Sequence, residues 1–421
     1  MRKVTTIAEA DVDERDAIGT NDARDRLLQT QWVLSNDLAL EARDATHVTL
    51  FHKTTAVRLK VSDGMHRLLL NFAQPKTLAE AAPGKFGERL LPQLQTLVRK
   101  GILVNADAPL LIASPRLLSA VAYRFCNAPA FDGAAPADFT VLGVPYDLAS
   151  TRDCRGAPSA IRQKSVDYSY EILFTTGRPQ GWFDANRGAR ILTGATLADA
   201  GDVHVEYGEH QRDLFTRIGN ALDATIAAGS VPVVLGGDRS VTFAVADYLR
   251  RREPLTVVQF APKPALAAIT RDGFVNDDAV GSALLALEGV QTFVGLGGAD
   301  AQSDATFPPR AVLASASTLR RTGSTTIARR LGEGRALHVS IDLGIASPAL
   351  MTPDDSGKAA GLVLHELKSQ LLALGTAHRI VGIDLVGLDQ QSEAASLCAI
   401  SACHLALTAM SAAHDRQEPC A

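Results

Sequence analysis

The sequence predicts an α/β protein, with a main domain built on a parallel sheet and a small α+β domain before it. Two observations favour this fold class. From residue 139 onward, short apolar runs alternate with segments of helical periodicity, which is typical of a parallel sheet with crossover helices. Between residues 47 and 105, strand patterns come first, helix patterns follow and a strand pattern closes the segment, so these residues form a separate module.

The first domain follows a charged, alanine-rich segment, residues 1–46, which we expect to be a flexible or partly helical arm. Residues 47–125 form the small domain. Its strand and helix patterns lie at residues 48–51, 56–61, 63–72, 77–82, 90–100 and 102–104. Thr77 and Glu80 have the spacing of a capping box, in which the two side chains bond the free N–H groups of a helix start. Two strands, three helices and a strand predict a winged-helix-like fold.

Two local sequences in this domain carry a resemblance. Residues 76–82, Lys-Thr-Leu-Ala-Glu-Ala-Ala, and 97–103, Leu-Val-Arg-Lys-Gly-Ile-Leu, resemble the peptide-recognition elements of ribosomal-peptide (RiPP) biosynthesis. The resemblance implies capture of a precursor (leader) peptide as a strand added to an exposed sheet edge. The candidate peptide-binding residues are Val48, Leu50, Ala56 and Arg58. The alternative is a small helical cap on the main domain; DNA binding is disfavoured because the second and third helices are poor in Lys and Arg.

The main domain follows a segment rich in Pro, Gly and Ala, residues 126–138, which we expect to be a linker. The predicted strands of residues 139–421 lie at 139–143, 231–235, 255–260, 292–296, 336–341 and 380–386. The strand at 231–235 ends at Gly236 and Gly237, which allow backbone or ligand to approach closely. Ligands of open α/β sheets bind outside the carboxyl ends of strands, so this strand end is the candidate site.

Motifs along this domain resemble those of the ureohydrolase family, which includes arginases and agmatinases. Residues 236–240, Gly-Gly-Asp-Arg-Ser, are similar to the family's Gly-Gly-Asp-His-Ser signature, with Arg239 in place of a metal-binding His. Residues 143–147, 160–162 and 199–202 match further family motifs in the same order along the chain. The resemblance implies an arginase-like fold, a three-layer, doubly wound parallel sheet.

Active ureohydrolases hold two manganese ions, whose bridging water attacks a guanidinium carbon. The resemblance implies six ligand positions at three strand ends. Here they are Arg239, Ala261, Lys263, Ala265, Asp342 and Gly344. Only Asp342 keeps a ligand side chain, because a guanidinium has no acceptor and stays protonated. We therefore expect no metal, no other cofactor and no metal-dependent ureohydrolysis. An Arg239–Lys263–Asp342 cluster is expected instead, either as a structural unit or as an anion pocket.

A second family position bears on the same chemistry. The glutamate that faces the guanidinium of the family's substrates falls on Gly387. Cys154 lies between Arg152 and Arg155, and neighbouring cations lower a thiol pKa, so Cys154 is the one catalytic candidate. The default interpretation is an ordinary loop cysteine.

Composition excludes several other classes of function. Apolar residues make up 46% of the 421 residues and the net charge is −4, which gives no basic field for nucleic acid. We find no apolar run of about 18 residues and expect no membrane span. The five cysteines show no pairing pattern, which favours a reducing, cytoplasmic location.

The function that we predict is non-catalytic. The protein binds a precursor peptide and presents it to a partner modifying enzyme, which raises the effective concentration of one for the other. Two alternatives remain open. One is an enzyme with metal-independent chemistry on a peptide or guanidino substrate, and the other is a pseudoenzyme that regulates an active ureohydrolase. The sequence leaves homo- or hetero-oligomerisation open.

Overall fold

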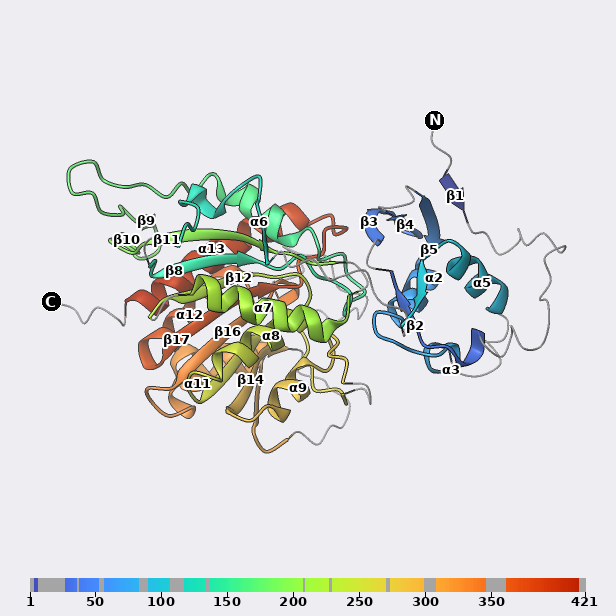
Figure 1. Cartoon of the computed structure of the whole chain (residues 1–421). Helices are drawn as coiled ribbons and strands as arrows, with labels where there is room; N and C mark the ends of the chain where they lie inside the picture. The colour runs from blue at the N-terminus through green and yellow to red at the C-terminus, as the bar shows by residue number, and fades with distance from the viewer. Residues whose placement is uncertain are drawn as a thin grey trace. The chain divides into compact units, whose positions relative to one another are not determined.

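The computed structural model describes residues 4–6, 27–35, 38–52, 57–82, 90–106, 117–133, 136–206, 209–226, 229–269, 273–298, 308–345 and 361–415. The chain divides into two compact units, which are coloured along the chain in Figure 1. The first contains Met1–Arg116 and Val205–Leu214, and the second contains Leu117–His204 and Phe215–Ala421.

The first unit is built around a four-stranded sheet in the order β1-β5-β4-β3, as far as its described residues show. The strands are β1 (Val4–Thr6), β3 (Leu38–Arg43), β4 (His47–His52) and β5 (Arg58–Ser62). β3, β4 and β5 are antiparallel, whereas β1 pairs in parallel with β5. Alternate residues of β4 and β5 are buried, as expected when one face of a sheet covers a core.

Helices and a second ladder complete this unit. These elements are β2 (Trp32–Leu34), α2 (Asp63–Leu70), α3 (Leu78–Ala81), α5 (Leu91–Arg99) and β6 (Leu103–Asn105). The predicted capping box is confirmed: the Thr77 side chain accepts from the Glu80 N–H, and the Glu80 carboxylate accepts from the Thr77 N–H. The apolar sides of α2 and α5 face the core, where Leu69, Leu94 and Leu97 are buried.

Two predicted boundaries differ from the structure. The expected arm, residues 1–46, contains β1, β2 and β3, so most of its described residues belong to the first unit's sheets, while residues 27–29 are helical. The expected linker, residues 126–138, begins inside the second unit, where Cys126 and Ala128 have no exposed surface. The Pro, Gly and Ala content was taken as the mark of a linker, but small residues are equally suited to a tightly packed turn.

The second unit is built on a nine-stranded sheet in the order β15-β14-β13-β16-β17-β12-β8-β11-β7, counted over its described residues. All of its ladders are parallel except that of the edge strand β7. The strands are β7 (Leu118–Ser119), β8 (Phe139–Gly143), β11 (Leu197–Val203), β12 (Val231–Leu235), β13 (Leu255–Phe260), β14 (Val290–Gly298), β15 (Ala311–Ser315), β16 (Ala336–Asp342) and β17 (Arg379–Val386). A separate hairpin pairs β9 (Trp182–Asp184) with β10 (Ala189–Ile191).

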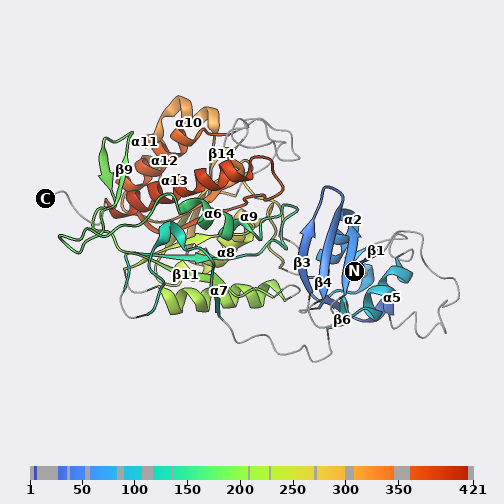
Figure 2. The ribbon, with the colours of Figure 1, turned by 90° about the horizontal axis from the view of Figure 1, so that it is seen from above.

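Helices cover both faces of the large sheet, as Figure 2 shows. One layer contains α6 (Ala157–Ser165), α10 (Ala316–Thr322), α11 (Ser324–Arg330), α12 (Leu364–Ala377) and α13 (Ala395–His414). The other contains α7 (Gln211–Thr225), α8 (Ser240–Leu249) and α9 (Val280–Ala286). Short 3-10 turns lie at η2 (Phe125–Asn127) and η3 (Leu343–Ile345). The predicted α/β class is confirmed, because β8, β12, β13 and β16 are buried along their whole length between the two layers.

One helix of the described chain, α13, is long and apolar enough to cross a membrane by length and composition. Its most apolar window is 72% buried inside the protein. The same apolarity is expected of a helix that packs in a core, and α13 contacts α6, α12 and β17.

Candidate functional site

The candidate site lies at the carboxyl ends of neighbouring parallel strands. Arg152 follows β8, Arg239 follows β12, Lys263 follows β13, Asp342 ends β16 and Gly387 follows β17. Because these strands run in the same direction, their carboxyl ends meet at one edge of the sheet. The sheet thus gathers charged residues that are as far as 190 positions apart in the chain.

Asp342 lies at the centre of this group. Its Oδ1 accepts a hydrogen bond from Arg152 Nη1 at 3.1 Å and another from the Gly344 N–H at 2.9 Å. Its Oδ2 lies 3.3 Å from Arg239 Nε, an ion pair outside hydrogen-bond geometry. The Asp342 side chain has no exposed surface. One buried carboxylate is therefore clamped between two guanidiniums.

The Arg239 side chain is held on both sides. Its Nη2 donates to Gln259 Oε1 at 3.2 Å and to the main-chain oxygen of Lys263 at 2.8 Å. Its own main-chain N–H donates to Asp277 Oδ1 at 2.9 Å. Only 4% of the Arg239 side chain is exposed. A buried cation needs such partners, because desolvation without them costs several kcal/mol.

Arg152 closes the network from the loop after β8. Its Nη2 lies 3.3 Å from Asp277 Oδ2, and its Nη1 donates to the Gly387 main-chain oxygen at 3.1 Å. The four charges of Arg152, Arg239, Asp277 and Asp342 sum to zero. We call these four residues the arginine–aspartate network.

The electrostatics follow from this arrangement. Burial by itself raises the pKa of Asp342, but the guanidiniums of Arg152 and Arg239 outweigh it and leave the pKa below its usual value. Burial by itself lowers the pKa of Arg152, and the carboxylates of Asp342 and Asp277 raise it well above its usual value. Asp342 and Arg152 are therefore both charged at neutral pH.

The predicted cluster is found in part. The Arg239–Asp342 contact was expected, but Lys263 enters the network through its main-chain oxygen. Sequence reasoning missed Arg152 and Asp277. Arg152 lies in the loop that was singled out for Cys154, so its position after the first strand was a usable signal. Asp277 belongs to no motif, and only the folded chain brings it to the site.

The residues at the six expected ligand positions do not fit a dinuclear metal centre. Arg239 is a cation; Ala261, Ala265 and Gly344 lack a donor side chain; and the carboxylate of Asp342 is occupied by arginines. No group of three His, Cys, Asp or Glu side chains with metal-binding geometry occurs in the part of the chain that the structure describes.

Gly387 shows how tightly the site is filled. A Cβ at this position would lie 2.4 Å from Asp342 Oδ1 and 2.9 Å from Arg152 Nη1. Its φ of +75° also belongs to the left-handed region, which favours glycine. The side chain of a glutamate, which the ureohydrolase resemblance implies here, has no room while Arg152 bonds Asp342.

The structure favours the default interpretation of Cys154, an ordinary cysteine, over the catalytic candidate. Its side chain is fully buried, and burial raises the pKa of the thiol well above its usual value although the Arg152 charge lowers it. Asp277 and Asp238 raise it further. Cys154 is thus a protonated packing residue, and the two neighbouring arginines in sequence do not activate it.

The candidate peptide-binding residues are placed differently from the prediction. Val48 and Leu50 lie on β4, which is paired on both sides, and neither has exposed surface. They are core residues and not an edge. Ala56 lies outside the described residues. Arg58 begins β5, where its guanidinium bonds Glu41 at 2.6 Å and stacks 4.8 Å from the centre of the Phe51 ring.

Comparisons with known proteins agree with this picture of the second unit. The sequence profile of the arginase family matches residues 137–412. The chain is 30% identical over 117 residues to the human (Homo sapiens) mitochondrial guanidino acid hydrolase, covering 27% of this chain and 30% of that protein. It is 30% identical over 110 residues to the chicken (Gallus gallus) mitochondrial agmatinase, covering 26% and 28%. The chain thus aligns with less than a third of the length of these curated relatives.

Solved structures extend the likeness to the whole α/β unit. A hypothetical agmatinase from Burkholderia thailandensis superposes with a TM-score of 0.57 at 20% identity, covering 73% of this chain and 97% of that one. Proclavaminate amidino hydrolase from Streptomyces clavuligerus gives 0.56 at 20% identity, covering 71% and 100%. Formiminoglutamase from Trypanosoma cruzi, solved with Mn²⁺, gives 0.52 at 17% identity, covering 68% and 98%. At these identities the likeness shows the fold alone.

Proposed function

This chain belongs to the arginase family, and from that premise we propose that it is a non-hydrolytic member of it. In this proposal the first unit binds an extended precursor peptide and presents it to a separate modifying enzyme. The second unit keeps the arginase-like sheet but holds an arginine–aspartate network in place of a metal pair.

The contact between Asp342 and the two arginines carries the first half of the proposal. A divalent cation that replaced the arginines as partner of Asp342 would lie next to Arg152 and Arg239. At a separation of about 4 Å and an effective dielectric constant of about 20, each guanidinium would repel it by about 8 kcal/mol. The Oδ1 atom of Asp342 already accepts from Arg152 and from the Gly344 N–H, and its Oδ2 faces the Arg239 guanidinium. Hydrolysis through a bound pair of metal ions therefore has no support in this chain's residues.

The peptide-binding half is supported by β1. Residues Val4–Thr6 form a strand at the edge of the first unit's sheet, where Val4 pairs with Arg58 and Thr6 pairs with Lys60. The edge of β5 thus accepts an extended segment through main-chain hydrogen bonds, which is the mode of peptide recognition by strand addition. A precursor peptide would bind at this edge after displacing β1.

The side chains of β5 favour recognition through the main chain. The Arg58 charge is paired with Glu41, and Lys60 Nζ lies 3.2 Å from Asp44 Oδ2. Because both cations already have carboxylate partners, they add little preference for an acidic or a basic peptide. The β5 edge would read backbone extension more than side-chain charge.

Metal-independent chemistry receives less support. It would need a nucleophile at the strand ends, and Cys154, the candidate for this role, is buried with a raised thiol pKa. The network charges are paired with one another, which leaves them poorly suited to polarise a substrate.

The proposal is tested with two assays on the full chain. Urea release is measured from arginine and agmatine after incubation with Mn²⁺ and again without metal, and we expect none in either case. A displayed library of random 12-residue peptides is then selected on the immobilised protein. Enrichment of peptides that compete with one another for the β5 edge supports the proposal. Urea release overturns the non-hydrolytic half, and a library without enriched members overturns the peptide half.

A further inference from the structure

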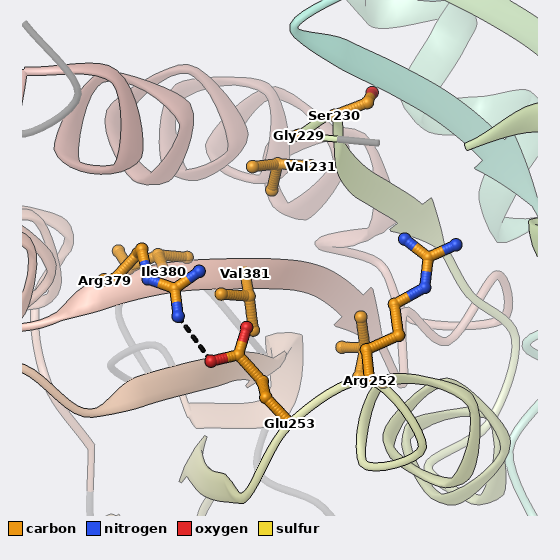
Figure 3. A pocket seen from close by; sticks show the side chains of 9 residues that line it. Gly229, Ser230, Val231, Arg252, Glu253, Arg379, Ile380 and Val381 are labelled. Carbon is orange, nitrogen blue, oxygen red and sulfur yellow. Dashed lines mark hydrogen bonds and ion pairs between the residues drawn. The ribbon is translucent and has the colours of Figure 1, made fainter. Parts of the chain in front are cut away.

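A cavity of about 470 Å³ opens at the amino ends of β12 and β17, the ends opposite to the arginine–aspartate network. Its walls come from the segment that enters β12, the end of α8 and the start of β17, and Figure 3 shows them from close by. None of the residues that line the cavity is part of the candidate site. Its origin, lining and charge point to a binding site.

The cavity originates in a split of the sheet. The β12–β17 ladder begins only at Val233 and Ile383. Before that point Val231 and Pro232 pair with β8, while Arg379 and Ile380 pair with β16. Pro232 has no main-chain N–H to donate, which favours an interruption of the ladder here. The two strands diverge toward their amino ends, and the space between them is open beside the carboxyl end of α8.

The cavity combines an apolar floor with charged sides. Val231, Leu249, Ile380 and Val381 supply the apolar surface. Leu249 is held against β17 because Gly382 has no side chain, and a Cβ there would lie 2.5 Å from Leu249 Cδ1. A floor of branched aliphatic side chains suits the hydrocarbon part of a small ligand.

Three charged side chains line the sides. Arg379 and Glu253 form an ion pair, which Figure 3 marks with a dashed line. Arg252 lies on the other side of the cavity. Its guanidinium stacks 4.7 Å from the centre of the Tyr248 ring and bonds the Tyr248 hydroxyl. The net charge of these three residues is +1.

Arg252 differs from the neighbouring arginines in the partner of its guanidinium. Arg250 and Arg251 share the carboxylate of Asp247. Arg252 forms no direct ion pair in the described part of the chain, although the Tyr248 hydroxyl that it bonds also bonds the Asp223 carboxylate. Stacking on Tyr248 holds the guanidinium in a fixed direction. A stacked, oriented guanidinium is suited to bind a carboxylate or a phosphate through two parallel hydrogen bonds.

The end of α8 does not cancel this preference. Free carbonyls at a helix end repel anions, but here the Leu249 carbonyl accepts from the Arg252 main-chain N–H. The Tyr248 carbonyl accepts from the main-chain N–H groups of Arg250 and Arg251. We propose that the split between β12 and β17 binds a small organic anion, whose oxyanion pairs with Arg252 and whose apolar body lies on Val231, Leu249 and Val381.

The test uses the full chain and three probes that share a phenyl group and differ in the polar head. They are 3-phenylpropionate, phenyl phosphate and the neutral 3-phenylpropionamide, and binding is followed by calorimetry and ligand-observed NMR. For ligands of this size in a site of this kind we expect a Kd of about 1 mM or tighter for at least one anion. Phosphate binding at least tenfold tighter than carboxylate binding would identify a phosphate-bearing ligand, and the reverse would identify a carboxylate. The amide should bind at least tenfold more weakly than the better anion.

Variants decide whether Arg252 is responsible. Arg252→Gln removes the charge at an exposed position and should weaken anion binding at least tenfold with an unchanged thermal midpoint. Arg251→Gln is the matched control, because Arg251 is adjacent, exposed and outside the cavity lining, and it should change the Kd less than twofold. Equal effects of the two variants, equal binding of the amide, or no binding of either anion at 10 mM would each overturn the proposal.

Discussion

Arg239 Nε lies 3.3 Å from Asp342 Oδ2 at the carboxyl ends of two strands of the large sheet. Arg239 is the N-cap residue of α8, Asp342 ends β16, and Arg152 and Asp277 complete a neutral network around them. Both residues occupy positions where the family resemblance implies metal ligands, and here one of them is a cation that pairs with the other. We infer that the network stabilises the crevice of the sheet and takes the place of a metal pair there.

Removing the central carboxylate should destabilise the fold. Asp342→Ala leaves Arg152 and Arg239 facing each other without their shared partner, and an uncompensated buried charge costs about 3–5 kcal/mol of unfolding free energy. Urea denaturation monitored by circular dichroism measures this loss. The control is Asp213→Asn, an exposed position on α7 where we expect a change within about 0.5 kcal/mol. A loss at Asp342 no larger than at Asp213 would show that the network contributes nothing to stability.

The same carboxylate should make stability depend on pH in the acid range. Burial by itself raises the pKa of Asp342, but the two arginines outweigh burial, so the folded-state pKa lies below its usual value. A depressed carboxyl pKa contributes stability above the unfolded pKa of about 3.9, and this contribution is lost as the pH falls through the folded value.

The measurement compares wild type with Asp342→Asn. The difference in unfolding free energy between them should be constant from neutral pH down to about pH 5 and should shrink below about pH 4. A difference that grows on acidification would mean that Asp342 is protonated in the folded protein, contrary to a clamp by two guanidiniums.

Gly387 should be intolerant of any side chain. Gly387→Ala places a Cβ 2.4 Å from Asp342 Oδ1 at a φ of +75°. Gly332→Ala is a matched control, because Gly332 has a φ of +76° but nothing within 4 Å of the added Cβ. Both variants place a Cβ on a backbone with positive φ, which costs about 1–2 kcal/mol of unfolding free energy, and only Gly387→Ala adds a steric clash. We expect Gly387→Ala to cost at least about 2 kcal/mol more than the control in chemical denaturation. Equal costs would contradict the packing described around Asp342.

Deleting the first ten residues should open the peptide-binding edge. The deletion removes β1 and leaves β5 as an edge strand of the first unit's sheet. A fluorescent peptide with the sequence of residues 1–10 should bind the shortened chain and should bind the full chain at least tenfold more weakly, since its own β1 competes at high effective concentration. Fluorescence anisotropy measures both affinities.

The control peptide carries Pro in place of Thr5, which removes a main-chain donor and should bind more weakly to the shortened chain. Equal affinity of the two chains for the unmodified peptide would show that β1 does not occupy the binding edge. Failure of the shortened chain to bind that peptide would likewise exclude strand addition at β5.

The sequence predicted six of the nine described strands of the large sheet, because these six are apolar runs that end at glycines or polar loops. β7, β11 and β15 were not predicted as strands. The predicted strands 139–143 and 255–260 coincide with β8 and β13. The first 46 residues were harder, because β2 and β3 are short and their strand character comes from pairing with β6 and β4. Local composition does not report such pairing.

The candidate site was predictable only where a motif marked it. Arg239 and Asp342 occupy recognisable positions, and their contact followed from parallel strands that end at one edge. Asp277 lies in a loop before α9 without any motif, and its bonds to Arg152 and Arg239 depend on the folded chain. The direction of the Cys154 pKa was misjudged because neighbouring charges are visible in sequence and burial is not.

Manganese stoichiometry tests the central claim most directly. The full chain is dialysed against excess Mn²⁺, passed through a desalting column and analysed for metal by mass spectrometry, with Asp342→Asn treated in parallel. We predict that the wild type retains no more manganese than the variant, far below one ion per chain, because two guanidiniums already bind the one carboxylate found at the six expected ligand positions. A retained pair of ions per wild-type chain that disappears in Asp342→Asn would contradict the account.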